Sequence, residues 1–132
     1  MSYKFKLTDM IPAAPEAIYA AWMSSRGHSA MTGGKAKTST KIGGAFTAWD
    51  GYISGVNLAL VPGERIEQSW RTSEFSDAHP DSKIVVTLKA LKDGTRITLR
   101  HSNVPDGQTS YERGGWQEHY FEPMKKYFGK KK

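Results

Sequence analysis

Residues 43–71 constrain the fold most, because they combine two turn signals with three strand-like patterns. Asp50-Gly51 lies between two runs of β-forming residues. Such a pair predicts a hairpin, since both central positions of a type I′ turn need positive φ. Pro62-Gly63 predicts the next turn. Gly55 interrupts the middle strand and predicts a bulge or bend, so we expect a curved antiparallel sheet with a concave side.

Length and composition bound the class of protein. At 132 residues we expect one domain, residues 1–132, long enough to hold a core without disulfides. Cysteine is absent, which excludes thiolate zinc sites and cysteine nucleophiles. Because no apolar run approaches a signal peptide or membrane span, we expect a soluble, cytoplasmic protein. The net charge is +6, but three C-terminal lysines supply half of it, so nucleic acid is not an expected partner.

Periodicity predicts the order of the remaining elements. Residues 3–8 alternate apolar and polar side chains, as in a half-buried strand. Pro15 opens a helix where its missing N–H costs nothing, and residues 25–31 indicate a second short helical turn. Residues 35–41 place three lysines on one face, as in a charged edge strand. Asp93-Gly94 separates two alternating runs and predicts a second hairpin.

A long aromatic helix is expected from about residue 110 to residue 128. Thr109 and Glu112 fit a capping box at its start. Pro123 cannot donate a hydrogen bond to the carbonyl of His119, so we expect a bend there. A helix of about 18 residues is roughly 27 Å long and would lie along the whole sheet. Its inward face would carry Trp116, Tyr120 and Met124.

One strand, two short helices, a meander of strands and a long C-terminal helix form the order of the helix-grip fold, also called Bet v 1-like or START-like. We therefore expect an α+β protein. Its curved antiparallel sheet would have about six or seven strands, with two short helices after the first strand. The C-terminal helix would pack over the sheet.

Over nearly its full length the chain resembles the family named after the activator of Hsp90 ATPase, AHSA1, within the START/Bet v 1-like (SRPBCC) superfamily. The motifs that carry the resemblance are turns, aromatic residues and prolines spread along the sequence: Pro12, Pro15, Ile18-Tyr19, Trp22, His28-Ser29, Thr32-Gly33, Gly43-Gly44, Phe46, residues 49–55, Leu60, Pro62, residues 69–71, residues 94–96, His101, Val104-Pro105, Gly115-Trp116, Tyr120, residues 123–125 and Tyr127-Phe128. The resemblance implies a pocket between sheet and last helix, of the kind that binds lipids or aromatic compounds in the superfamily.

Strand parity and helical phase predict which residues would line such a pocket. We expect each of these side chains to face the space between sheet and helix or to offer a polar tip to it: Phe46, Trp49, Trp70, Ile97, Leu99, His101, Trp116, Tyr120 and Met124. One interpretation is that they simply fill the core. The other is that they bind a mostly apolar ligand, which the polar tips would orient.

His101 is the weak candidate for catalysis. It shares parity with inward residues of its strand, so a neutral imidazole could serve as hydrogen-bond partner or general base. The alternative is a structural histidine, because the sequence pairs no acid or nucleophile with it. His28 could lie at a pocket mouth, although a capping or surface role is the competing interpretation, and His119 is expected in solvent. No zinc, nucleophile-elbow or dinucleotide motif is present, so no metal or cofactor is expected.

Three functional hypotheses remain. The first is a non-catalytic module that binds a hydrophobic or aromatic small molecule beneath the C-terminal helix. The second, implied by the family resemblance, is an Hsp90-type chaperone co-factor that acts through surface contacts. The third is a cyclase- or hydrolase-like enzyme that uses His101. In each case we expect a monomer or weak dimer without nucleic acid as a partner.

Overall fold

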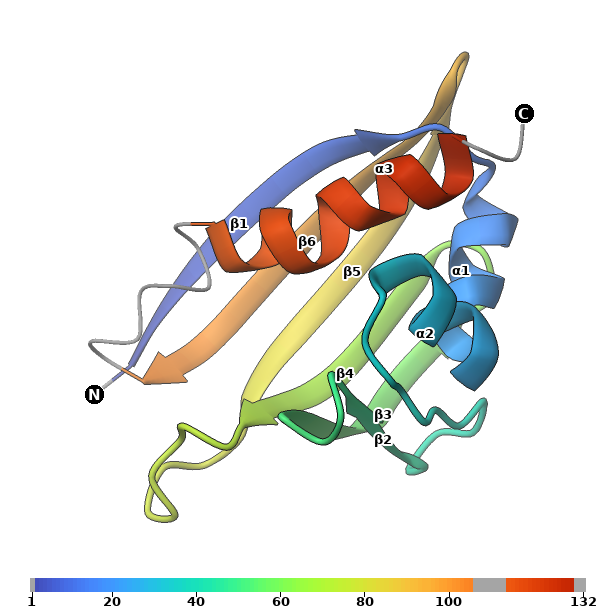
Figure 1. The fold of residues 1–132 in the computed structure, drawn as a ribbon. Helices are drawn as coiled ribbons and strands as arrows, with labels where there is room; N and C mark the ends of the chain where they lie inside the picture. The colour runs from blue at the N-terminus through green and yellow to red at the C-terminus, as the bar shows by residue number, and fades with distance from the viewer. Residues whose placement is uncertain (1, 106–113, 130–132) are drawn as a thin grey trace.

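The computed structural model describes residues 2–105 and 114–129. Six antiparallel strands form one sheet in the order β1-β6-β5-β4-β3-β2 (Figure 1). The curved antiparallel sheet of the α+β helix-grip fold is therefore confirmed. The strands are β1 Ser2–Ile11, β2 Ala45–Ala48, β3 Ile53–Val61, β4 Arg65–Thr72, β5 Ser82–Leu91 and β6 Gly94–Pro105.

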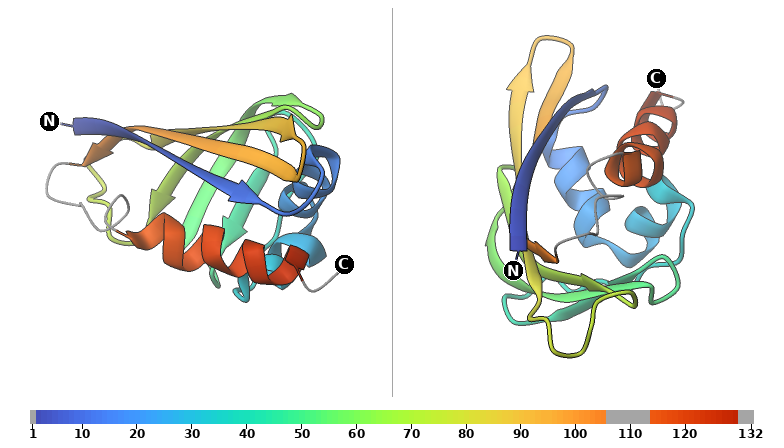
Figure 2. Two further views of the ribbon diagram at one scale, coloured as in Figure 1. Left: turned by 90° about the horizontal axis from the view of Figure 1, so that it is seen from above. Right: turned by 90° about the vertical axis from the view of Figure 1, so that its left-hand side faces the viewer.

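The helices lie on one face of the sheet, and the two further views show the C-terminal helix running along its concave side (Figure 2). They are α1 Pro15–Met23, α2 Ser25–Thr32, the π-helical turn η2 Gln117–Phe121 and α3 Glu122–Gly129. Pro15 occupies the first turn of α1, as predicted. The side chain of Ser24 caps α2 by accepting from the N–H of Gly27 at 3.0 Å. The two short helices after the first strand are thus confirmed.

The first predicted hairpin forms, with a longer loop than expected. Asp50 has φ of 58° and Gly51 has φ of 89°, so both central positions are left-handed as predicted. Trp49 also has positive φ, at 52°, and the strand pairing closes at Ala48 opposite Ile53. Trp49 therefore belongs to the turn and not to a strand.

The irregularity expected at Gly55 lies further along β3. The register between β3 and β4 shifts between Asn57 and Ala59, not at Gly55, so the predicted position of the bulge is wrong. Gly55 is needed for another reason, because a Cβ there would clash with the backbone carbonyl oxygen of Ser69 on β4. The glycine allows two strands to approach closely, and the register shift of β3 lies two or more positions further along the strand.

The second predicted hairpin forms one residue earlier than expected. Gly94 already pairs with Leu91, so the turn consists of Lys92 and Asp93. A Cβ on Gly94 would clash with the carbonyl oxygen of Ile11 at the end of β1. The glycine thus permits β1 to pass close to β6. Although Asp93-Gly94 resembles a turn signal, Gly94 is not one of the two turn residues.

The charged strand predicted at residues 35–41 is wrong. Within the described residues this segment makes one isolated bridge, between Lys37 and Thr47. Side chains satisfy much of its remaining backbone: the N–H of Thr38 donates to a serine hydroxyl of α2 at 2.8 Å. The amide of Asn57 on β3 donates to two of the segment's carbonyls, at 2.7 and 2.9 Å. The segment is a loop held by side chains.

The C-terminal helix is irregular where the sequence predicted a bend. The N–H of Glu122 donates to the carbonyl of Gln117, five residues earlier, and this widens the helix just before Pro123. The predicted capping box of Thr109 and Glu112 lies outside the described residues. Lys125 on α3 forms an ion pair with Asp9 on β1 at 2.9 Å, which fastens the helix to the edge strand.

A buried polar and aromatic network beneath the C-terminal helix

A chain of contacting aromatic rings lies between the sheet and the C-terminal helix. Trp70 on β4 contacts Trp116 with ring centroids 5.4 Å apart, and Trp116 contacts Tyr120 at 4.9 Å. Tyr120 in turn contacts Trp22 of α1 at 5.1 Å. Each of these rings is almost fully buried. The chain joins the sheet, the C-terminal helix and α1 into one core.

His101 lies at the sheet end of this chain and is fully buried. Its Nδ1 accepts a hydrogen bond from Trp116 Nε1 at 3.3 Å. Its Nε2 lies 2.8 Å from the hydroxyl of Ser82 on β5, and that hydroxyl donates to the carbonyl of Trp70 at 2.5 Å. Because the serine proton points to a carbonyl, the proton between His101 and Ser82 belongs to the histidine. The ring is therefore the neutral tautomer that carries its proton on Nε2.

This arrangement limits what His101 can do chemically. The sequence paired no nucleophile with it, whereas the structure places the Ser82 hydroxyl against its ring. However, Ser82 accepts its hydrogen bond and cannot transfer its own proton to Nδ1, where Trp116 donates. Burial lowers the pKa of His101 to about 3. Both ring nitrogens are engaged, so the geometry gives no support to the hypothesis of a general base.

His28 forms a second buried network, so the predicted surface role is wrong, whereas its bond to the last turn of α1 is a capping contact. Only 2% of the residue is exposed. Its Nδ1 donates to the carbonyl of Trp22 at 2.9 Å, so its Nε2 accepts from the hydroxyl of Tyr120 at 2.7 Å. Burial lowers the pKa of His28 and raises the pKa of Tyr120, so both groups stay neutral. This pair connects α2 to the C-terminal helix.

A polar chain continues from α1 across the sheet. Trp22 Nε1 donates to Gln68 Oε1 at 3.4 Å, and the Gln68 amide donates to Asn57 Oδ1 at 2.8 Å. Asn57 and Gln68 are almost fully buried and are paired opposite each other on β3 and β4. Because a buried amide is costly unless it is hydrogen-bonded, this chain fixes the positions of the two strands and α1.

The structure brings most of the predicted pocket residues together. All of them except Trp49 are buried and belong to one hydrophobic core or to the His101 network: Phe46, Trp70, Ile97, Leu99, His101, Trp116, Tyr120 and Met124. Trp49 is half-buried and packs against the edge of this core, with its ring 5.1 Å from that of the exposed His119. His119 is exposed as predicted, but it also contacts this tryptophan. Whether a ligand enters between these residues stays a prediction.

Two buried polar atoms in the described residues have no hydrogen-bond partner. They are Nε1 of Trp49, a donor, and Oε1 of Gln117, an acceptor. An unpaired polar atom in a protein interior is costly, and such atoms often mark a place for water or a ligand. Gln117 begins the π-helical turn, two residues before the His119 that contacts Trp49.

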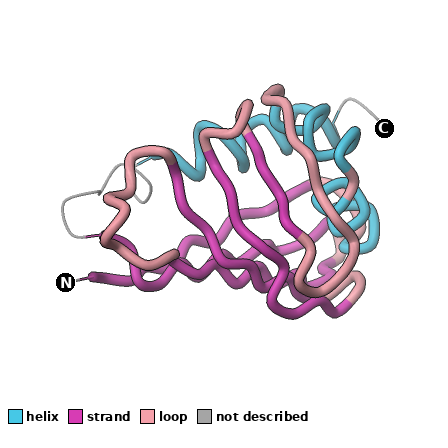
Figure 3. The backbone as a smooth tube through the Cα atoms, turned by 90° about the horizontal axis from the view of Figure 1, so that it is seen from below, coloured by secondary structure: helices cyan, strands magenta, loops and turns pink. Residues whose placement is uncertain are grey.

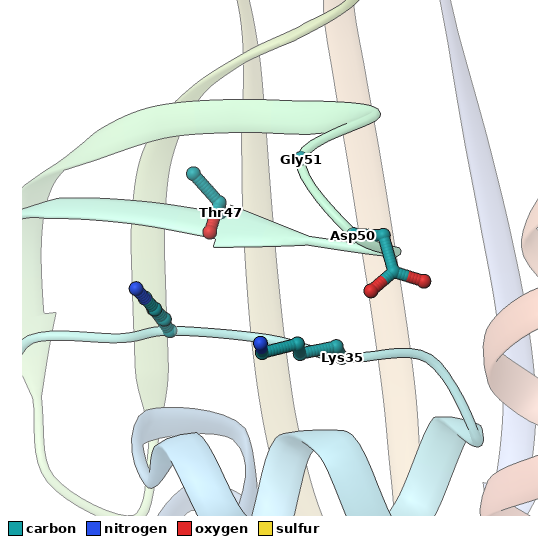
Figure 4. Close-up of a pocket in the computed structure, with 5 residues that line it drawn as sticks. Lys35, Thr47, Asp50 and Gly51 are labelled. Carbon is teal, nitrogen blue, oxygen red and sulfur yellow. The ribbon is translucent and has the colours of Figure 1, made fainter.

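Residues of the described part of the chain line at least two open hollows of the surface. One, of about 330 Å³, lies beside the first hairpin and is lined by Lys35, Lys37, Thr47, Asp50 and Gly51 (Figure 4). The other, of about 510 Å³, lies between α1 and the end of the C-terminal helix, at Pro12, Ala13, Ala17, Ala20, Ala21, Ser24, Gly27, Tyr127 and Phe128. Neither hollow is lined by the predicted pocket residues. Among the described residues, no group of acidic and histidine side chains is arranged to hold a metal ion, and no helix could cross a membrane.

Comparison with known proteins decides the family. The sequence model described as "Activator of Hsp90 ATPase homolog 1-like protein" matches residues 12–129. The chain belongs to this family. The human activator of 90 kDa heat shock protein ATPase homolog 1 is 29% identical over 96% of this chain, and a Dictyostelium discoideum homologue is 25% identical over 93%. The chain spans 37% and 32% of the lengths of these two proteins.

Solved structures of AHSA1-like proteins share the fold. A crystal structure of an HSP90 activator from Plasmodium falciparum superposes with a TM-score of 0.87, at 20% identity and 96% coverage of each chain. The solution structure of an Aha1 dimer from Colwellia psychrerythraea gives a TM-score of 0.72 at 16% identity, with 86% of this chain and 87% of that chain covered. A tube view from below shows the continuous strand layer that defines this fold (Figure 3).

Sequence reasoning missed several members of the network in this AHSA1 protein. Gln68 shares strand parity with the inward Ile66 and Trp70, and Ser82 shares it with the inward Ile84. That alternation was a signal that these polar residues face the core. For His28 no comparable signal exists, because its bond to Tyr120 depends on how α2 packs against the distant C-terminal helix.

Proposed function

We propose that this AHSA1 protein is a cytoplasmic co-factor of an Hsp90-type ATPase and acts through surface contacts. The observation that supports the proposal is the packed aromatic and polar network beneath the C-terminal helix. Rings and hydrogen-bonded polar groups of the chain itself form it, from Trp70 through His101 and Trp116 to Tyr120. Relatives that align with 96% of this chain are named as activators of a heat shock protein ATPase.

The packing beneath the C-terminal helix favours binding of a partner at the protein surface over binding of a ligand in the interior. A molecule entering between sheet and helix would have to displace contacting rings and break the bonds of His28 and His101. Leaving such buried groups unpaired costs about 1–3 kcal/mol each, which would be subtracted from the ligand's affinity. A protein partner on the surface requires no such rearrangement.

A binding and turnover assay tests this proposal. Purified protein is titrated into an Hsp90-type ATPase, and binding is followed by calorimetry while ATP hydrolysis is followed by phosphate release. We expect binding with a dissociation constant of about 10 μM or tighter and a changed hydrolysis rate. Hen lysozyme, a small basic protein, serves as the control for non-specific charge effects. An unchanged rate together with no binding at tens of micromolar would refute the proposal.

A small-molecule site remains a second candidate, because one observation favours it. Trp49 Nε1 and Gln117 Oε1 are buried without partners, and a ligand with both an acceptor and a donor would satisfy them. Native mass spectrometry of the purified protein, followed by NMR screening of lipids and aromatic compounds, tests this candidate. We expect shifts at both residues that disappear in Trp49→Phe and Gln117→Leu. If no compound co-purifies and none shifts these resonances, the candidate is abandoned.

The oligomeric state of this chain is a further proposal. The Colwellia psychrerythraea neighbour is described as a dimer. We propose a monomer or weak dimer for this chain, and sedimentation velocity over a range of concentrations tests it. A dimer that persists at nanomolar concentration would contradict this proposal.

A further inference from the structure

The outer face of β1, β6 and β5 carries cations in matched positions. Lys6 on β1 is paired directly with Arg100 on β6, and Arg96 on β6 is paired with Lys89 on β5. All four residues are exposed. The helices cover the opposite face (Figure 2). We name this set of Lys6, Arg100, Arg96 and Lys89 the outer basic face.

No carboxylate neutralises the outer basic face within residues 2–105 and 114–129. Asp9 has inward parity on β1 and forms its ion pair with Lys125 on the other side of the sheet. Glu67 on β4 is occupied by Arg65 at 2.6 Å and by Lys83 at 3.1 Å. The cations of the face thus form no ion pair in the described chain.

The outer basic face does not stabilise the folded protein. Like charges directly opposite each other in an antiparallel pair are destabilising. Both cross-strand pairs of the outer basic face are of that kind. A row of uncompensated cations on a rigid sheet instead attracts anionic partners and raises their association rate. The charge pattern therefore points to binding.

The spacing and composition of the outer basic face indicate whether its partner is a nucleic acid, a membrane or a protein. Arg96 and Arg100 are four positions apart, so the two cation pairs lie about 13 Å apart along the strand. The outward residues of the described β1, β6 and β5 include no aromatic side chain, so bases have nothing to stack on. Among the described outward residues of these strands, Met10 is the large apolar side chain that is exposed, at 41%, which is too little for insertion into a membrane. Carboxylates on a protein surface fit best.

We propose that the outer basic face docks an acidic surface of the partner protein, with carboxylates contacting the Lys6–Arg100 pair and the Arg96–Lys89 pair. This inference rests on the proposed function, which requires a protein partner, and it assigns the surface that the partner contacts. The contact is electrostatic, so it weakens as salt concentration rises. The buried network beneath the helix takes no part in it and only holds the sheet rigid.

A pair of charge-matched variants tests the inference. The outer variant is Lys6→Gln, Lys89→Gln, Arg96→Gln and Arg100→Gln. The control variant is Arg26→Gln, Lys35→Gln, Lys37→Gln and Lys41→Gln, which changes four exposed cations elsewhere. Each variant lowers the net charge from +6 by four, to +2. Because the outer variant removes like-charge repulsion, we expect it to fold and to melt no lower than the unmodified protein.

Binding is measured against an Hsp90-type ATPase and against fluorescein-labelled decaglutamate at low and high salt. We expect the outer variant to bind both about tenfold more weakly, and the control variant to lose less than about threefold. Equal losses in the two variants, or no loss in the outer variant, would overturn the inference. If the outer variant misfolds, Lys6→Gln with Arg100→Gln replaces it.

The two probes separate the possible failures. If the unmodified protein does not bind the ATPase, the proposed function fails, while the decaglutamate comparison still decides whether the outer basic face binds acidic chains. If the ATPase binds both variants equally well, the proposed function stands and this surface is wrong. Labelled oligothymidine and phosphatidylserine vesicles complete the test. Tighter binding to either than to decaglutamate at the same salt concentration would overturn the assignment to an acidic protein.

Discussion

Trp116 of the C-terminal helix donates its indole N–H to Nδ1 of His101 on β6, at 3.3 Å. From there the protons point in one direction, from the histidine to the hydroxyl of Ser82 and from that hydroxyl to the carbonyl of Trp70. Every donor in this series of hydrogen bonds has an acceptor, and the series begins at the indole N–H of Trp116. The helix is therefore attached to the sheet by a specific hydrogen bond as well as by apolar contact, and this attachment can be tested residue by residue.

Replacing Trp116 with Phe should cost more stability than replacing Trp49 with Phe. The first change removes the donor to a fully buried His101 nitrogen, and leaving that acceptor unpaired costs about 1–3 kcal/mol in addition to the lost ring volume. The second removes a donor that has no partner in the described structure. Urea denaturation of both variants gives the free energies of unfolding. Equal costs would contradict the hydrogen bond from Trp116 to His101.

The two buried histidines should be opposite tautomers. His101 is expected to carry its proton on Nε2, because Trp116 donates to its Nδ1. His28 is expected to carry its proton on Nδ1, because that atom faces the carbonyl of Trp22. Long-range ¹H–¹⁵N correlation spectra distinguish the two forms by the chemical shifts of the ring nitrogens. If both residues show the same tautomer, the hydrogen bonds of at least one of the two networks are assigned incorrectly.

Stability should fall as the pH is lowered from 7 to 5. Burial holds the pKa of His101 at about 3, below its ordinary value of 6.5, and lowers that of His28 in the same direction. In this window the unfolded chain takes up protons that the folded chain does not, so acid favours unfolding, by about 1 kcal/mol per pH unit for His101. His28 acts in the same direction. The contribution is fully present above pH 6.5 and is lost progressively below it.

Denaturation at several pH values measures this effect, and His101→Gln provides the control. The variant lacks the titrating group, so its free energy of unfolding should depend less steeply on pH between 7 and 5, even though it is less stable throughout. This range lies above the ordinary pKa of Glu67, whose own pKa is lowered further by Arg65 and Lys83, so that carboxylate does not contribute. An identical slope in the variant and the unmodified protein would contradict the burial of a neutral His101.

The sequence predicts the architecture well because the relevant signals are local. Alternation in β6 correctly placed Ile97, Leu99 and His101 on the inner face. The first Asp-Gly turn formed with positive φ at both residues, as its local sequence predicts. Pro123 correctly indicated an irregular helix, since a missing backbone donor acts on its own turn.

Contacts between distant segments could not be predicted in the same way. The glycines at 55 and 94 look like bend and turn signals, but each is needed because another strand passes close to it. The lysines of residues 35–41 resemble an edge strand, whereas side chains from α2 and β3 satisfy that backbone. His28 and Tyr120 are 92 positions apart, so their bond depends on tertiary packing alone.

The close approach at Gly55 gives the sharpest test of the sheet. Gly55→Ala would place a Cβ against the carbonyl oxygen of Ser69 and the ring of Phe46, and neither the paired backbone nor the buried ring can move freely. We expect a loss of at least about 2 kcal/mol in the free energy of unfolding. Gly129→Ala is the matched control, because nothing lies within 4 Å of its added Cβ and alanine favours a helix, so its effect should stay within about 1 kcal/mol. Urea denaturation of the two variants decides the matter: a Gly55→Ala protein as stable as the control would mean that β3 and β4 are not packed as closely as their register requires.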